Sequence, residues 1–236
     1  INKIDGQKLM LGRNYFGAGM VEAGDADAFI SGLTRDYPST ISPALQIIGK
    51  DDNTKRVAGM YIIQTKMGPL FFADTTVNID PSAEELVDIA SSTARVVEVL
   101  DYEPRLAMIS YSNFGSAKGK EPKKMSEATA LLKQKHPNII VDGEMQANIA
   151  LSPELQKELY PFSALAESGA NTLIFPNLAT GNTAYKLVME IGHTEAIGPI
   201  LMGMKKPVHI LQMGSSVRDI VNMIAIAVID AQTKEN

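Results

Sequence analysis

The chain of 236 residues contains no cysteine and no tryptophan. The absence of cysteine excludes a disulfide framework, thiolate catalysis and cysteine-ligated metal centres. It also fits a reducing compartment. The three histidines, His136, His193 and His209, do not have the spacing of metal ligands. The sequence therefore predicts no metal site.

Positive charge is also scarce. The chain has 22 Lys and Arg against 27 Asp and Glu, which gives a formal net charge of -5. No overall field would attract nucleic acid or an anionic membrane, so a phosphate-bearing ligand would need local groups. No apolar run reaches the roughly 18 residues that span a bilayer, and residues 1–16 lack the apolar region of a signal peptide. We expect a cytoplasmic protein that binds neither nucleic acid nor membranes.

The remaining composition is that of a globular protein, with 45% hydrophobic and 21% charged residues. Expected strands alternate with expected helices, a pattern typical of a mainly parallel, doubly wound α/β sheet. The clearest helix covers residues 82–100, because Ser82 and Glu85 form a capping-box pattern before an apolar stripe. The other expected elements are strands at 26–33, 57–64, 68–75, 105–111, 138–142, 172–175 and 208–211, and helices at 43–48, 125–135, 153–160, 180–191 and 216–231.

Polar, glycine-containing turns follow several of these strands and open the next helix. Such turns meet at the carboxyl edge of a parallel sheet, where ligands bind. Each turn can equally be an ordinary helix cap, and Ser216 with Asp219 reads as a capping box of the last helix. The candidate ligand residues are Ser112, Asn113, Phe114, Gly115, Ser116, Thr180, Gly181, Asn182, Tyr185, Lys186, Gln212, Met213, Gly214 and Asp219.

Other charged groups near these turns have two interpretations. Lys118, Lys120, Lys123 and Lys124 could neutralise phosphates, although a short lysine cluster is usually a solvated loop. Asp142 and Glu144 lie at a strand end. They could polarise a site, but a loop cap or a hydrogen bond between lobes is the simpler interpretation.

Several long motifs carry a resemblance to a known family. They read GDADAFISGLTRDYP, SPALQIIG, ISYSNFGSAKG, VDGEMQANIAL, PFSALAESGANTLIFPNLATGNTAYKLV and IGPILMGMKKPVHILQMGSSVRDIV. Together they resemble the phosphotransacetylase (phosphate acetyl/butaryltransferase) family, in the version that forms the C-terminal domain of bacterial NADP-dependent malic enzymes. The resemblance extends over nearly the whole chain.

The resemblance implies a two-lobed, isocitrate-dehydrogenase-like α/β/α fold with a cleft. It places residues 1–47 and 200–236 in the first lobe and residues 48–199 in the second, with crossings near 46–49 and 199–202. By the same comparison, the N-terminal part of the first lobe is expected to be missing. Family members associate through apolar helix faces, so the resemblance also implies a homo-oligomer, a dimer or a higher assembly such as a hexamer.

The resemblance further implies where acetyl transfer would occur and where this sequence departs from it. Asp219 matches the aspartate that accepts the proton of the CoA thiol. Gln212 and Met213 stand where the active transferases carry Ser-Arg, Ser42 replaces a phosphate-binding arginine, and Phe114 replaces a lysine. Guanidinium groups bind phosphate in a two-pronged geometry that other side chains do not reproduce. We therefore expect weak or absent transfer.

Three functions stay open at this point. The first is a regulatory and oligomerisation domain that binds acetyl-CoA or CoA as an allosteric inhibitor, with NADP, divalent metal and malate handled by other domains of the same polypeptide. The second is an active phosphate acetyltransferase that converts acetyl-CoA and phosphate into acetyl phosphate and CoA. The third is a structural scaffold without a ligand.

Overall fold

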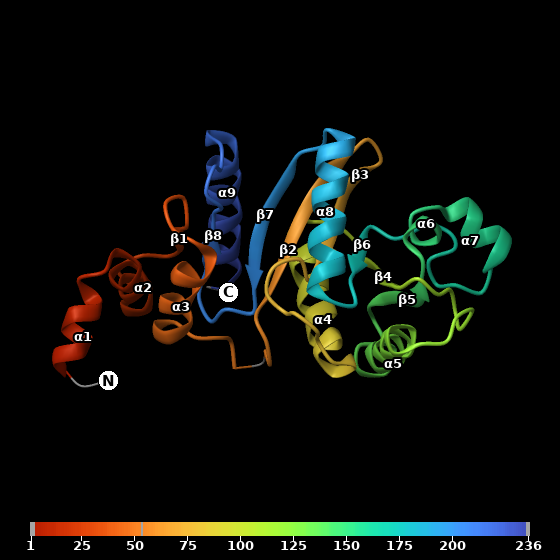
Figure 1. Ribbon diagram of the computed structural model, residues 1–236, viewed down its shortest axis with the longest axis horizontal. Helices are drawn as coiled ribbons and strands as arrows, with labels where there is room; N and C mark the ends of the chain where they lie inside the picture. Colours follow the sequence, from red (N-terminus) through yellow and green to blue (C-terminus); the bar gives the residue numbers. More distant parts are fainter. Residues whose placement is uncertain (1–2, 53, 235–236) are drawn as a thin grey trace. The chain divides into compact units, whose positions relative to one another are not determined.

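The computed structural model describes residues 3–52 and 54–234. The chain forms two compact units. The first contains residues Ile1–Val57 and Ile197–Asn236, and the second contains residues Ala58–Ala196. The boundaries thus fall at 57/58 and 196/197, whereas the resemblance places them at 47/48 and 199/200. Each unit has its own sheet and helices (Figure 1).

The second unit is built on five strands in the order β5-β4-β6-β3-β2. Strands β3, β4, β5 and β6 run parallel to one another, and β2 pairs antiparallel with β3 through a tight hairpin. A two-residue connection permits only the antiparallel pairing, since a parallel one needs a long crossover. The bounds are β2 Ala58–Thr65, β3 Gly68–Ala73, β4 Arg105–Ile109, β5 Ile140–Met145 and β6 Thr172–Ile174.

Helices cover both faces of this sheet (Figure 1). Helices α4 (Ala83–Val99) and α5 (Lys120–Lys135) pack against each other. Helix α4 also packs on β3, β4 and β6, and α5 packs on β4 and β5. Helix α6 (Ala147–Ala150) packs on β4, and α8 (Leu178–Gly192) packs on β2 and β3. Helix α7 (Pro153–Leu159) contacts α6. Alternate strand residues point to opposite faces. Phe72, for example, joins a cluster with residues of α6 and α8, whereas its neighbour Phe71 contacts Tyr102, just after α4.

The first unit has a two-stranded parallel sheet of β1 (Phe29–Ser31) and β8 (Val208–Ile210). Helices α1 (Lys3–Met10) and α2 (Arg13–Ala23) pack together, and α2 also contacts α3 (Tyr37–Ile47) and β1. Helix α9 (Val217–Lys234) packs on β1 and β8. Strand β7 (Ala196–Met202) carries the chain from the second unit back into the first. No helix in residues 3–52 and 54–234 is long and apolar enough to cross a membrane.

The mainly parallel α/β architecture is confirmed, as is the capping box of α4, in which Ser82 and Glu85 exchange both hydrogen bonds. Some expected helices begin earlier than predicted, and some elements were not predicted. Helix α3 begins at Tyr37 rather than Pro43. Helix α5 begins at Lys120 rather than Met125, so three of the four clustered lysines lie on a helix. Helices α1 and α2 were not anticipated, and the segment near Pro199 is the strand β7.

Candidate functional site

The carboxyl edge of the second unit's sheet gathers four loops. Strands β3, β4, β5 and β6 form consecutive parallel pairs, so they all end at this edge. In sheets of this kind, the edge where the strands end is the usual place for a ligand. Two of the sequence-predicted segments, residues 112–116 and the start of α8, lie at this edge.

The loop of residues 112–116 is organised around the buried carboxylate of Glu144. The Ser112 hydroxyl and the Gly115 N–H each donate a hydrogen bond of 2.8 Å to Glu144 Oε1, and the Phe114 N–H donates to the Glu144 carbonyl. Glu144 is only 2% exposed. Its interpretation as a loop cap is confirmed, because the carboxylate compensates its burial by accepting these bonds. Within the loop, Phe114 adopts a positive φ of 48°.

The Phe114 side chain belongs to a cluster of three aromatic rings. Its ring centroid lies 5.0 Å from that of Tyr160 and 5.0 Å from that of Phe162. Such tilted aromatic pairs contribute about 0.5–1.5 kcal/mol beyond their buried area. Phe162 is 70% exposed, so the three rings form an apolar surface beside the loop.

A second buried carboxylate, which the sequence did not single out, organises the loop after β3. Asp74 Oδ1 accepts from the N–H groups of Thr76 and Val77, and Asp74 Oδ2 accepts from the N–H of Asn78 at 2.8 Å. Asp74 is 2% exposed. Aspartate bonding its own following backbone is a common turn signal, so the segment ADTTVN could have indicated this loop.

Helix α8 begins earlier than the sequence indicated. Its N-cap is Asn177, whose Oδ1 accepts the Thr180 N–H at 2.9 Å. Thr180, Gly181 and Asn182 are therefore residues of the first turns and do not form a turn before the helix. The expectation that these residues form a polar turn that opens the helix is therefore wrong, because the helix begins at Leu178. The Asn182 amide donates to the Thr75 carbonyl at 3.1 Å, which ties α8 to the loop after β3.

The last two predicted residues of α8 have different surroundings. Tyr185 is 3% exposed and stacks on Tyr61, with ring centroids 4.1 Å apart. Lys186 is exposed, and its Nζ lies 5.8 Å from the centre of the Tyr185 ring. The Tyr185 ring thus belongs to the core of the second unit.

A cavity of about 590 Å³ opens at the same edge, between the loops after β3 and β6. Of the predicted residues, Asn182 lines it, together with Thr183, while Ser112, Asn113, Phe114, Gly115 and Ser116 do not. Two carboxylates, Asp80 and Glu121, also line the cavity. Their charge disfavours a phosphate here and favours hydroxyl, amide or ammonium groups of a ligand.

Two of the four clustered lysines, Lys123 and Lys124, have partners within the described residues. Lys124 Nζ lies 2.6 Å from Asp80 Oδ1 and donates to the Pro176 carbonyl, so it joins α5 to both rims of this cavity. Lys123 lies 3.7 Å from Glu127 on the same helix. Asp142 pairs with Lys133 at 2.7 Å and accepts the Ala164 N–H at 2.9 Å, which fits a structural cap.

The first unit carries the predicted residues before α9. The Asp219 carboxylate accepts the Ser216 N–H at 2.7 Å and the Ser216 hydroxyl at 2.9 Å, while the Asp219 N–H donates to Ser216 Oγ. The capping box expected from the sequence is thus formed. Gly214 has a φ of 89°, which turns the chain between Met213 and Ser216.

Three positions that depart from the transferase pattern, Ser42, Gln212 and Met213, carry uncharged side chains. The Met213 side chain is exposed, at 67% for the residue. Ser42 lies within α3, and its hydroxyl donates to the Pro38 carbonyl at 2.8 Å. Gln212 is exposed in the turn after β8, where its N–H donates to Ser215 Oγ. None of the three can offer a guanidinium group.

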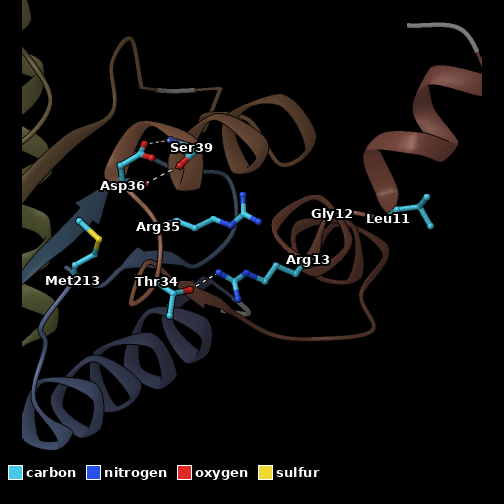
Figure 2. Close-up of a pocket in the computed structure, with 8 residues that line it drawn as sticks. All are labelled: Leu11, Gly12, Arg13, Thr34, Arg35, Asp36, Ser39 and Met213. Atoms are coloured by element: carbon cyan, nitrogen blue, oxygen red, sulfur yellow. Dashed lines mark hydrogen bonds between the residues drawn. The ribbon is translucent and has the colours of Figure 1, made fainter.

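A cavity of about 760 Å³ lies in the first unit beside Met213. Arg13, at the start of α2, and Arg35, just before α3, both line it (Figure 2). Sequence reasoning missed both arginines. They lie far apart along the chain, and although Arg35 belongs to the motif GDADAFISGLTRDYP, neither was a candidate ligand. The remaining lining residues are Leu11, Gly12, Thr34, Asp36 and Ser39.

Comparison with known proteins agrees with this architecture. Residues 2–228 match the family described as phosphate acetyl/butaryl transferase. The chain is 37% identical to the phosphate acetyltransferase of Bacillus subtilis over 95% of its own length and 69% of that protein. It is 40% identical to the NADP-dependent malic enzyme of Escherichia coli over 92% of its own length but only 29% of the enzyme.

The fold comparison gives the same result. A phosphotransacetylase from Streptococcus pyogenes superposes with a TM-score of 0.93 and 38% identity, covering 98% of this chain and 70% of that one. A family match over almost the whole sequence, together with relatives at this level of identity, is decisive. The chain belongs to the phosphate acetyl/butaryl transferase family.

Proposed function

We propose that this chain is a phosphotransacetylase-like domain of a cytoplasmic malic enzyme, which binds acetyl-CoA as an allosteric inhibitor and no longer transfers acetyl groups efficiently. The observation that carries this proposal is the turn before α9. There Gln212 and the exposed Met213 stand in place of the expected Ser-Arg pair. The other reactions of such a protein, the NADP- and metal-dependent oxidation of malate to pyruvate, belong to other domains of the same polypeptide.

Loss of acetyl transfer follows from the chemistry of the reaction. Attack on the acetyl carbonyl builds negative charge, which a guanidinium at position 213 would stabilise and a thioether cannot. One such contact is worth about 3 kcal/mol, or roughly a hundredfold in rate. In addition, Asp219 Oδ2 already accepts two hydrogen bonds from Ser216. A proton from the CoA thiol would need the other carboxylate oxygen or would displace these bonds.

Association of copies is the second part of the proposal. Helix α9 presents apolar side chains to solvent, with Val217 at 78%, Val221 at 58% and Val228 at 50% exposure. With Ile224 they recur at helical spacing and form one stripe. Exposed stripes of this kind mark interfaces. A second copy of the chain is the proposed partner, in a dimer or a higher assembly.

Two measurements on the same preparation test the proposal. Isothermal titration calorimetry with acetyl-CoA and CoA should show binding, and a CoA-release assay with acetyl-CoA and phosphate should show turnover near background. The double variant Gln212→Ser with Met213→Arg should raise that turnover, whereas Met213→Leu should not. Absence of binding by the intact, assembled protein would refute the regulatory role and leave a scaffold.

The alternative is an active phosphate acetyltransferase. It is favoured by the retention of Asp219 and by the similarity to phosphate acetyltransferases, which is as strong as the similarity to malic enzymes. The same assay discriminates between the two. Rapid CoA release that Asp219→Asn abolishes, while Asp25→Asn in the loop after α2 does not, would establish the alternative.

A further inference from the structure

The cavity beside Met213 collects positive charge in a protein whose formal net charge is -5. Arg13 and Arg35 enter it from two sides, Arg13 from the start of α2 and Arg35 from the segment between β1 and α3 (Figure 2). The Arg13 guanidinium donates a hydrogen bond to the Thr34 hydroxyl, which holds that side chain against the cavity wall. Neither arginine forms an ion pair within residues 3–52 and 54–234, and both line the cavity.

Among the described residues that line this cavity, Asp36 is the one with a carboxylate, and this carboxylate already accepts a hydrogen bond. Asp36 is the N-cap of α3, and its Oδ1 accepts the Ser39 N–H at 2.9 Å. This backbone hydrogen bond, that of the Ser39 hydroxyl and, to a smaller extent, the charge of Arg35 lower the pKa of Asp36. The carboxylate is therefore ionised at neutral pH. It offsets one of the two guanidinium charges, and a net positive charge remains in the cavity.

The backbone adds to this charge. Helix α2 starts in the cavity wall with Gly12 as its N-cap, and this residue has no side chain that could accept from the first turn. The N–H groups at the start of an 11-residue helix carry partial positive charge and favour an anion. The helix start supplements the two guanidinium groups, which are the principal anion ligands.

From these observations we propose that Arg13 and Arg35 bind a phosphoryl group, with Met213 as an apolar wall beside it. Guanidinium groups suit the tetrahedral oxygens of a phosphate, since each can donate two parallel hydrogen bonds. Arg13 and Arg35 would thus supply the guanidinium groups that residues 42 and 213 lack, although they occupy different positions in the fold. We identify this phosphoryl group as a phosphate of CoA, and this identification rests on the proposed function.

The test compares wild type with Arg13→Ala, Arg35→Ala and the double variant, each checked for folding by circular dichroism and melting temperature. Both arginines are exposed, so the variants should fold. Arg95→Ala, in the helix α4 of the second unit, is the matched control for removing an exposed arginine. Arg35→Lys keeps the charge but not the two-pronged geometry.

Calorimetry with CoA, dephospho-CoA and inorganic phosphate gives the readout. Each single variant should weaken CoA binding by about 10- to 100-fold, as expected for a hydrogen bond to a charged group. Arg95→Ala should bind like wild type. Weaker binding of dephospho-CoA to wild type would assign the pocket to the 3′-phosphate, and equal binding of both would assign it to the pyrophosphate. Inorganic phosphate should compete with CoA in either case.

The outcomes separate this inference from the proposed function. If wild type binds CoA and the double variant binds it equally well, the inference is overturned and the regulatory role stands. If wild type binds phosphate through the two arginines but does not bind acetyl-CoA, the inference stands and the regulatory role is refuted. Absence of binding for all three probes refutes both.

Discussion

Ser112 and Glu144 are joined by a hydrogen bond of 2.8 Å from the serine hydroxyl to Glu144 Oε1, and both residues are buried. This pair connects the loop after β4 to the end of β5, two segments that the sequence separates by a helix. The loop that resembles the ligand loop of the transferases is thus held in place by an internal carboxylate. The loop is therefore ordered by contacts within the protein.

Glu144→Ala should destabilise the second unit. The substitution removes the acceptor for the Ser112 hydroxyl and the Gly115 N–H, and leaving the buried Ser112 hydroxyl without this acceptor is costly. We expect a loss of about 3 kcal/mol in the free energy of unfolding, measured by urea denaturation. Glu158→Ala, an exposed glutamate on α7, should change it by no more than about 0.5 kcal/mol. Equal effects of the two variants would contradict the assigned role of Glu144.

Gly181→Ala should also be destabilising, for a steric reason. A Cβ at this position would lie 2.3 Å from the Asp74 carbonyl oxygen, in the backbone of the loop after β3. Helix α8 would have to move away, at a cost of about 1–3 kcal/mol or more. Gly6→Ala in α1, where nothing lies within 4 Å of the added methyl, should instead stabilise its helix slightly. Thermal unfolding of the two variants should therefore shift in opposite directions.

Tyr185 offers a direct test of core packing against ligand binding. Its ring stacks on Tyr61, so Tyr185→Ala should cost about 3–5 kcal/mol of stability. Tyr185→Phe keeps the stacked ring and should preserve both stability and acetyl-CoA affinity. If the phenylalanine variant folds normally but binds acetyl-CoA much more weakly, the tyrosine hydroxyl contacts the ligand, in agreement with the place of Tyr185 among the candidate ligand residues.

Acid should weaken the first unit through Asp230. Burial raises the pKa of this carboxyl, but the contact with His209 and the charge of Lys234 outweigh it, and the net pKa lies below the ordinary value of 3.8. His209 Nε2 lies 3.4 Å from Asp230 Oδ2, a contact that lacks hydrogen-bond geometry. A carboxyl with a lowered pKa stabilises the fold above its unfolded-state pKa, and this contribution disappears as the pH falls through the lower, folded-state pKa.

The corresponding experiment measures the free energy of unfolding between neutral pH and about pH 2. Wild type should lose stability progressively below about pH 4, the ordinary range of an aspartate. Asp230→Asn should start from a lower stability and lose less of it over the same range. Parallel pH profiles for the two proteins would show that Asp230 does not contribute to the acid sensitivity.

Local patterns in the sequence sufficed for the elements whose signals lie within a few residues. The capping boxes at Ser82 and Ser216 are examples, since each cap and its partner are three residues apart and formed as expected. The alternation of strands and helices likewise indicated the mainly parallel sheet. Helix α8 was misplaced at its start, because Gly181 looked like a turn residue when its role is close packing against Asp74.

What the sequence determined by itself was the family, the α/β class and the identity of the changed positions 42, 212 and 213. The tertiary structure decided which side chains share a site, because that depends on contacts between segments far apart in the chain. Glu144 accepts a hydrogen bond from Ser112, the start of α8 packs against the backbone of Asp74 at Gly181, and Arg13 and Arg35 line the same cavity. Two arginines separated by a helix, a loop and a strand carry no joint signal in the sequence, and they become an anion site only when the fold places them together.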